Sequence, residues 1–148
     1  MRTRILLVML LVMVALLAAC GGGSSSDSAA PAPAAGGPDA AKGKVLFNQP
    51  VLAGNAGCAT CHTLEVGKVL VGPSFAGLAT RAGSAVPGLS AEEYLRQSIT
   101  DPNAHLAAGC TATDLAVPCN PDIMLKDWGT KLTPEQMNDI IAYLMTLK

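Results

Sequence analysis

Two cysteines and a histidine in the run Cys58-Ala59-Thr60-Cys61-His62 are the residues with the clearest chemistry. A C-x-x-C-H sequence is the signature of covalent c-type haem attachment. Two thiols must add to the two vinyl groups of one haem, and residues three apart lie on one side of a helical turn. The histidine follows about 100° further round the helix, where its imidazole can bind iron as the proximal ligand. These residues predict one covalently bound haem c.

Two other kinds of site use the same pair of cysteines. A thioredoxin-like redox pair also contains C-x-x-C, but it needs no trailing histidine, and no βαβ pattern precedes Cys58. A zinc site would need further cysteine or histidine ligands at suitable spacing. Haem is favoured because the complete motif is present, and both alternatives stay open at this point.

The N-terminus predicts export from the cytoplasm. Arg2 and Arg4 precede an unbroken apolar run over residues 5–19, which has about the length of a signal-peptide core and is too short to span a bilayer. The run ends in Leu17-Ala18-Ala19-Cys20, which resembles a bacterial lipobox. We therefore interpret residues 1–19 as a lipoprotein signal peptide and Cys20 as the lipidated residue. The alternative is an ordinary signal peptide cleaved near the same point.

Residues 20–38 have the composition of a flexible tether. After Cys20, the segment contains Gly, Ser, Ala and Pro with Asp27 as its single charge, so it cannot bury enough apolar surface to order itself. Random-coil scaling gives it a mean reach of roughly 20–25 Å. We expect the mature protein to be lipid-anchored to a membrane facing the periplasm or the cell exterior.

The remaining residues, 39–148, are expected to form one domain. Aromatic residues make up only 3% of the chain, so a bound haem would help to fill the interior. Removing Arg2 and Arg4 with the signal leaves eight basic and eleven acidic residues. No basic patch is visible in the sequence, which argues against nucleic acid as a partner.

Capping signals predict a helical domain, and no segment is a convincing strand. Asp39 is the expected N-cap of a short helix that ends at Phe47. The capping box Ser90-Ala91-Glu92-Glu93 begins a second helix, which should end near Thr100 because Asp101-Pro102 follows. Thr133-Pro134-Glu135-Gln136 begins a last helix. Apolar residues recur along this helix at helical spacing, and we expect it to reach the C-terminus: Met137, Ile140, Ile141, Leu144 and Leu147.

In this order of elements the chain resembles the class I c-type cytochromes, which are small single-haem electron carriers. The resemblance covers nearly all of residues 39–148. It implies an all-α cytochrome c fold, with three to five helices around one covalently bound haem and crossed N- and C-terminal helices. The residues that carry it, besides the haem motif, follow the family's order: Gly43, Phe47, Gly72, Pro73, Tyr94, Met124, Ile140 and Tyr143.

The resemblance also implies contacts for particular residues. The first and last helices should cross at Gly43, with Phe47 and Tyr143 packed on either side. The Pro73 carbonyl should accept the Nδ1–H of His62, which would set the orientation of the proximal ring.

The expected distal ligand is Met124. It precedes Trp128-Gly129 and the last helix, as in the family's methionine loop, although Leu125 stands where the family usually has proline. Met137 and Met145 lie inside a helix and are interpreted as core. His105, in the loop after Asp101-Pro102, is the alternative ligand. Ligation by methionine would raise the reduction potential.

Cys110 and Cys119 are predicted to form a disulfide. They remain once Cys20, Cys58 and Cys61 are assigned, and the compartment is oxidising. Two free thiols are the alternative. A bond that closes a loop of about ten residues would contribute about 2–3 kcal/mol in the chain-entropy model. The segment resembles an insertion relative to the simplest family members.

Together these features predict a one-electron carrier and not an enzyme, since no nucleophile–base pair, paired carboxylates or phosphate loop is present in the sequence. The haem iron would cycle between ferric and ferrous with His62 and Met124 retained. The expected partners are redox proteins or membrane electron-transfer complexes. Two alternatives remain: a haem sensor in which a small gas reaches the iron, and a haem subunit held permanently in a membrane respiratory or photosynthetic complex.

Overall fold

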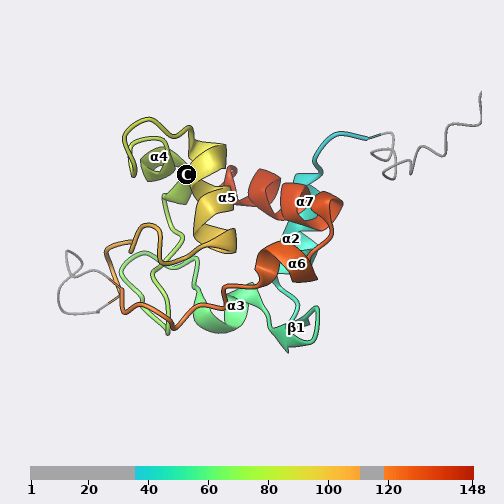
Figure 1. Cartoon of the computed structure of the whole chain (residues 1–148), viewed down its shortest axis with the longest axis horizontal. Coiled ribbons are helices and arrows are strands. Elements are labelled where there is room, and N and C mark those ends of the chain that lie inside the picture. The colour runs from blue at the N-terminus through green and yellow to red at the C-terminus, as the bar shows by residue number, and fades with distance from the viewer. Residues whose placement is uncertain (1–35, 111–118) are drawn as a thin grey trace, which may run out of the picture. The chain divides into compact units, whose positions relative to one another are not determined.

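The computed structural model describes residues 36–110 and 119–148 (Figure 1). The expected signal peptide at 1–19, the lipidation site Cys20 and most of the tether lie outside the described residues, as do residues 111–118. Among the helices of the described part, none has the length and apolar character needed to cross a membrane.

Three helices of eight to eleven residues frame the domain: α2 (Ala40–Phe47), α5 (Ala91–Thr100) and α7 (Pro134–Leu144). Three shorter helices of four or five residues lie between them: α3 (Cys58–Cys61), α4 (Leu78–Ala82) and α6 (Trp128–Lys131). α7 packs on α2 and α5, and α5 also contacts α4 and α6. The described part is therefore mainly helical, as the sequence predicts.

A small antiparallel hairpin, β1 (Val51–Leu52) and β2 (Asn55–Ala56), was not expected. Its turn residues Ala53 and Gly54 have φ angles of 47° and 79°, and positive φ at both positions is typical of a tight two-residue hairpin turn. The prediction that the domain has no strands was wrong here, because two-residue strands are too short to show an alternating pattern.

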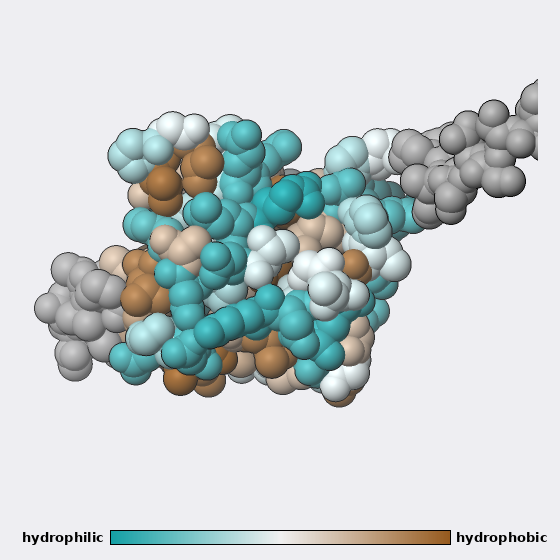
Figure 2. Space-filling model, viewed as in Figure 1, coloured by the Kyte–Doolittle hydropathy of each residue, from teal (hydrophilic) through white to brown (hydrophobic). Residues whose placement is uncertain are grey.

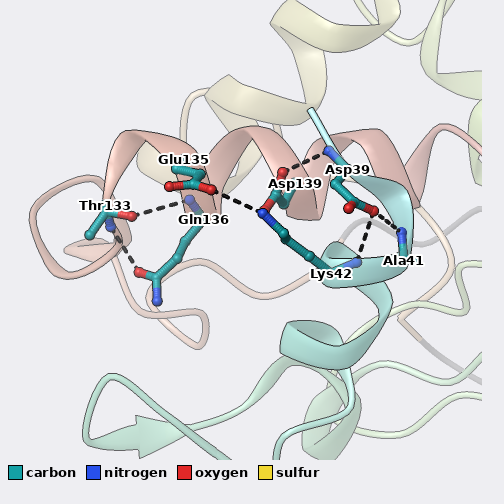
Figure 3. Close-up of polar contacts among 7 residues, drawn as sticks. All are labelled: Asp39, Ala41, Lys42, Thr133, Glu135, Gln136 and Asp139. Carbon is teal, nitrogen blue, oxygen red and sulfur yellow. Dashed lines mark hydrogen bonds and ion pairs between the residues drawn. The ribbon is translucent and has the colours of Figure 1, made fainter. Parts of the chain in front are cut away.

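The helix starts confirm the capping predictions. The Asp39 side chain caps α2 by accepting hydrogen bonds from backbone N–H groups of its first turn (Figure 3). Reciprocal capping boxes join Ser90 with Glu93 at the start of α5, and Thr133 with Gln136 at the start of α7. These bonds satisfy donors that would otherwise lack partners at a helix N-terminus.

The last helix is shorter than expected, because α7 ends at Leu144 and not at the C-terminus. Beyond it, the Leu147 carbonyl accepts a hydrogen bond from the Ala79 N–H of α4 at 2.8 Å, so the chain end contacts another helix. Met137 is only 4% exposed, which confirms it as a core residue, and Met145 packs against the same core.

α2 and α7 cross at Gly43, as expected (Figure 1). A Cβ atom at Gly43 would lie 2.5 Å from the carbonyl carbon of Asp139 and 2.9 Å from the Cβ of Tyr143, so the approach requires glycine. The rings of Phe47 and Tyr143 pack on each other beside the crossing, with centroids 5.4 Å apart, and do not lie on opposite sides of it.

A buried carboxylate also joins these two helices (Figure 3). Asp139 is 4% exposed, and its Oδ1 accepts a hydrogen bond from the Asp39 N–H at 2.7 Å. The N-terminal end of a helix favours a negative charge, so this position suits the side chain. An ion pair of 3.2 Å between Lys42 and Glu135 spans the same helices. These contacts fix how α2 lies on α7.

Candidate haem-binding site

The C-x-x-C-H motif forms a single helical turn in the wall of a cavity. The His62 N–H donates to the Cys58 carbonyl at 2.9 Å, which closes α3, and the Gly57 N–H donates to the Pro50 carbonyl at 3.0 Å. Among the described residues, Cys58 and Cys61 form no disulfide, and both half-buried side chains line the cavity. Two thiols therefore lie on one turn, as attachment to two vinyl groups of one haem needs.

The His62 ring is held by three neighbours. Its Nδ1 lies 3.0 Å from the Pro73 carbonyl oxygen. The ring stacks on Phe75 with centroids 4.1 Å apart. Gly72 covers the ring so closely that a Cβ there would lie 2.8 Å from Nδ1 and 3.1 Å from Nε2. These contacts orient the imidazole.

The environment of His62 favours the neutral ring over the protonated one. Burial lowers the pKa of His62, and the hydrogen bond to the Pro73 carbonyl acts in the opposite direction with a smaller effect. Because a carbonyl can only accept, the proton is assigned to Nδ1 and the lone pair to Nε2. This is the tautomer that a metal-binding histidine uses when its second nitrogen donates to a carbonyl.

A cavity of about 510 Å³ lies beside the motif, and its wall is mainly apolar. The apolar side chains come from several elements and include Phe47, Leu78, Leu95, Ile99 and Trp128. The Ser98 hydroxyl in this wall is buried and has no hydrogen-bond partner among the described residues. An apolar cavity with two thiols, a neutral imidazole and an orphaned hydroxyl fits a haem, which brings a large apolar face and polar groups of its own.

Both candidate distal ligands line this cavity together with His62. Met124 is partly buried and packs against the core. The His105 ring lies edge-on to Tyr94, with centroids 5.8 Å apart. The cavity thus brings together every haem-site residue that the sequence predicts, and it also contains the alternative ligand.

Cys110 and Cys119 are joined by a disulfide, with Cα atoms 4.9 Å apart. The Cys119 N–H also donates to the Ala107 carbonyl at 2.8 Å, next to this bond. Both cysteines line the cavity, so the disulfide borders the site directly.

Sequence reasoning missed Phe75 and Ser98. Ser98 follows Tyr94 by four residues and Leu95 by three on α5, so helical spacing from these buried residues could have placed it in the wall. Nothing local identifies Phe75, because its contact with His62 depends on how the chain folds back between Thr63 and Gly72.

These features define a helical domain built to hold a covalently attached haem. The chain belongs to the cytochrome c family, since the family model described as Cytochrome c matches residues 40–148. It is 32% identical over 133 residues to cytochrome c2 of Rhodopseudomonas palustris, covering 74% of this chain and 99% of the relative. It is also 30% identical over 92 residues to cytochrome c2 iso-2 of Magnetospirillum molischianum, covering 62% of this chain and 91% of the relative. No solved structure matches the chain.

Family membership confirms the all-α cytochrome c fold and the single covalent haem c. It also decides between the interpretations of the cysteine pair in favour of haem. The protein is an electron carrier and not an enzyme, and it therefore exchanges electrons with redox partners.

Proposed function

We propose that this protein is an exported, membrane-tethered one-electron carrier, with its haem attached to Cys58 and Cys61 and its iron held by His62 and Met124. The observation that carries the proposal is one cavity lined by two thiols, an oriented neutral imidazole and a thioether. When bound, the haem supplies the one-electron couple. His62 and Met124 would hold the iron in both oxidation states, so these residues would need little rearrangement during transfer.

Each of these residues would have a separate role around the cofactor. Cys58 and Cys61 hold it in place covalently. His62 would bind the iron through Nε2, and the Pro73 carbonyl lies at its Nδ1 and fixes the ring. Met124 supplies a soft thioether sulfur, which favours ferrous iron and raises the potential above that of a bis-histidine site.

The mouth of the cavity suits contact with a redox partner. Val71, Ile123 and Leu125 line the cavity and are 56%, 58% and 39% exposed. Figure 2 shows one face of the molecule, on which apolar residues lie along the lower margin and at the upper left among hydrophilic ones. Apolar contact of a partner with Val71, Ile123 and Leu125 would exclude water from the cavity mouth.

Haem attachment can be tested by extraction. Denatured wild-type protein should keep its haem through acid–acetone extraction and give the pyridine haemochrome bands of a haem with two thioether bonds. Serine at both Cys58 and Cys61 should abolish attachment. Serine at both Cys110 and Cys119 is the matched control and should leave attachment intact. Release of free haem from the wild type would contradict the proposal.

We also propose that residues 1–19 are removed and that a lipid on Cys20 anchors the domain through the tether 20–38. The support is the Leu17-Ala18-Ala19-Cys20 sequence and the composition of the segment after it. Two or more acyl chains anchor a protein stably, whereas a single chain binds membranes only marginally. No apolar anchor other than this lipid is needed.

The anchor can be tested separately from the haem. Cys20→Ser should remove the lipid, as read by intact mass, while the haem spectrum stays unchanged. A freely soluble wild-type protein that begins at an unmodified residue beyond Cys20 would contradict the anchor and leave the electron-carrier function intact.

A further inference from the structure

The two segments that carry the candidate distal ligands are joined by one pair of side chains. Asn103 precedes His105 by two residues, and Asp122 precedes Met124 by two. The Asn103 Nδ2 donates to the Asp122 Oδ1 at 2.8 Å, and the Asp122 backbone N–H donates to the Asn103 Oδ1 at 3.1 Å. The amide of Asn103 thus binds both the side chain and the backbone of one residue 19 positions away. We call this pair the Asn103–Asp122 clamp.

The clamp holds Asp122 in an unusual backbone conformation. Its φ is 64°, in the left-handed region that residues other than glycine rarely adopt, although Asp and Asn tolerate it best. The chain turns at Asp122 directly before Ile123 and Met124. Contacts that stabilise this turn therefore fix the direction from which Met124 enters the cavity wall.

The Cys110–Cys119 disulfide joins the same two segments further along. It lies five residues before Met124, whereas the clamp lies only two residues before it. Asn103 is also one of the residues that line the cavity, and Asp122 is not. The clamp is therefore the nearer restraint on the methionine and bridges the cavity wall to the protein surface.

We propose that the Asn103–Asp122 clamp positions Met124 and keeps it on the iron. The proposal rests on the proposed His62–Met124 ligation. Asn103 is a positioning residue, because it would act on Met124 through the turn at Asp122. The clamp needs only modest strength, since it opposes detachment of one ligand and not unfolding of the domain. Loss of its two hydrogen bonds should shift the detachment equilibrium by about tenfold.

The test is an imidazole titration of the ferric holoprotein. Added imidazole binds the iron only when Met124 has left, so its apparent affinity reports the detachment equilibrium. Asn103→Asp removes the amide donor and places a second carboxylate against Asp122, so charge repulsion replaces one clamp bond and weakens the other, in which the Asp122 N–H donates to residue 103. It should bind imidazole about tenfold more tightly than the wild type.

Two variants separate the clamp from other effects at Asp122. Asp122→Asn keeps an acceptor oxygen and the backbone donor, so the clamp can still form. Lys126→Gln removes the ion pair that Asp122 makes with Lys126 and leaves both clamp bonds in place. Both variants should bind imidazole like the wild type, and equal tightening in all three would overturn the inference.

Denaturant unfolding of the same proteins distinguishes positioning from general stabilisation. A lower unfolding midpoint for Asn103→Asp with unchanged imidazole affinity would overturn the inference. If Asn103→Asp fails to mature with haem, Asn103→Ala removes both bonds without adding charge and is judged by the same criteria. A wild-type spectrum that Met124→Ala leaves unaltered would instead contradict the proposed ligation.

Discussion

Substitution of Gly43 by alanine tests the helix crossing that forms part of the cavity wall. The added Cβ would lie 2.5 Å from the carbonyl carbon of Asp139 and 2.9 Å from the Cβ of Tyr143. The Asp139 carbonyl oxygen would lie closer still, and carbon atoms in good contact are about 3.5–4.0 Å apart, so α2 and α7 must separate by more than about 1 Å. The separation would loosen the Phe47–Tyr143 contact and lengthen the hydrogen bond between the Asp39 N–H and Asp139, now 2.7 Å.

The expected net cost is about 3 kcal/mol. In an exposed helix, alanine would be better than glycine by about 1 kcal/mol. Overpacking of a well-filled site costs about 1–3 kcal/mol and more when backbone meets backbone. A weakened bond to the buried Asp139 carboxylate adds about 1–3 kcal/mol. The melting temperature should therefore fall by roughly 10–20 °C.

The assay is thermal unfolding of the holoprotein, followed by far-ultraviolet circular dichroism at matched haem content. Gly129→Ala is the matched control, because Gly129 lies in α6 and the nearest atom to its added Cβ would be the Thr100 Cγ2 at 3.2 Å. This control should stay within about 1 kcal/mol of the wild type. A Gly43→Ala protein as stable as the control would refute the crossing as described.

Three further predictions concern the ligand, the disulfide and one helix cap. Met124→Ala should remove the ferric iron–methionine charge-transfer band, lower the reduction potential and let carbon monoxide bind the iron. His105→Ala should keep the band, and the reverse pattern would assign the ligand to His105. Replacing Cys110 and Cys119 by serine should lower the free energy of unfolding by about 2–3 kcal/mol and weaken the iron–methionine signal before global unfolding. Alkylation of both thiols in the unreduced wild type would rule the disulfide out. Hydrogen bonds from Ser90 in the α5 capping box lower the pKa of Glu93. The stability that the ionised Glu93 contributes is therefore present above the ordinary glutamate pKa and is lost as the pH falls through the lowered pKa of the folded state. Glu93→Gln should lose less stability on acidification than the wild type, and an identical acid profile would count against the cap.

The helix starts could be predicted because their causes are local. Asp39, Ser90 and Thr133 each accept a hydrogen bond from a backbone group two or three residues later. The end of α7 could not be predicted in this way, since the following turn contacts Ala79, far away in the sequence. The hairpin could not be predicted from the sequence, because its strands are only two residues long.

The residues of the site also fall into those that local sequence identifies and those that depend on tertiary contacts. The attachment motif is recognisable because covalent chemistry fixes the spacing of Cys58, Cys61 and His62. The stacking of Phe75 on His62 and the Asn103–Asp122 clamp depend on tertiary contacts, so neither leaves a sequence pattern. Met124 and His105 both reach the cavity, which is why their roles must be decided by spectroscopy.

The most direct test of the account is the magnetic circular dichroism spectrum of the purified holoprotein, oxidised and reduced, from the visible to the near infrared. The account predicts low-spin iron in both states, with the histidine–methionine signature in the ferric protein and no carbon monoxide binding in the ferrous protein. A bis-histidine signature would contradict the role of Met124. An open iron that binds carbon monoxide at once would contradict electron transfer with both ligands retained and would support a ligand-binding haem protein.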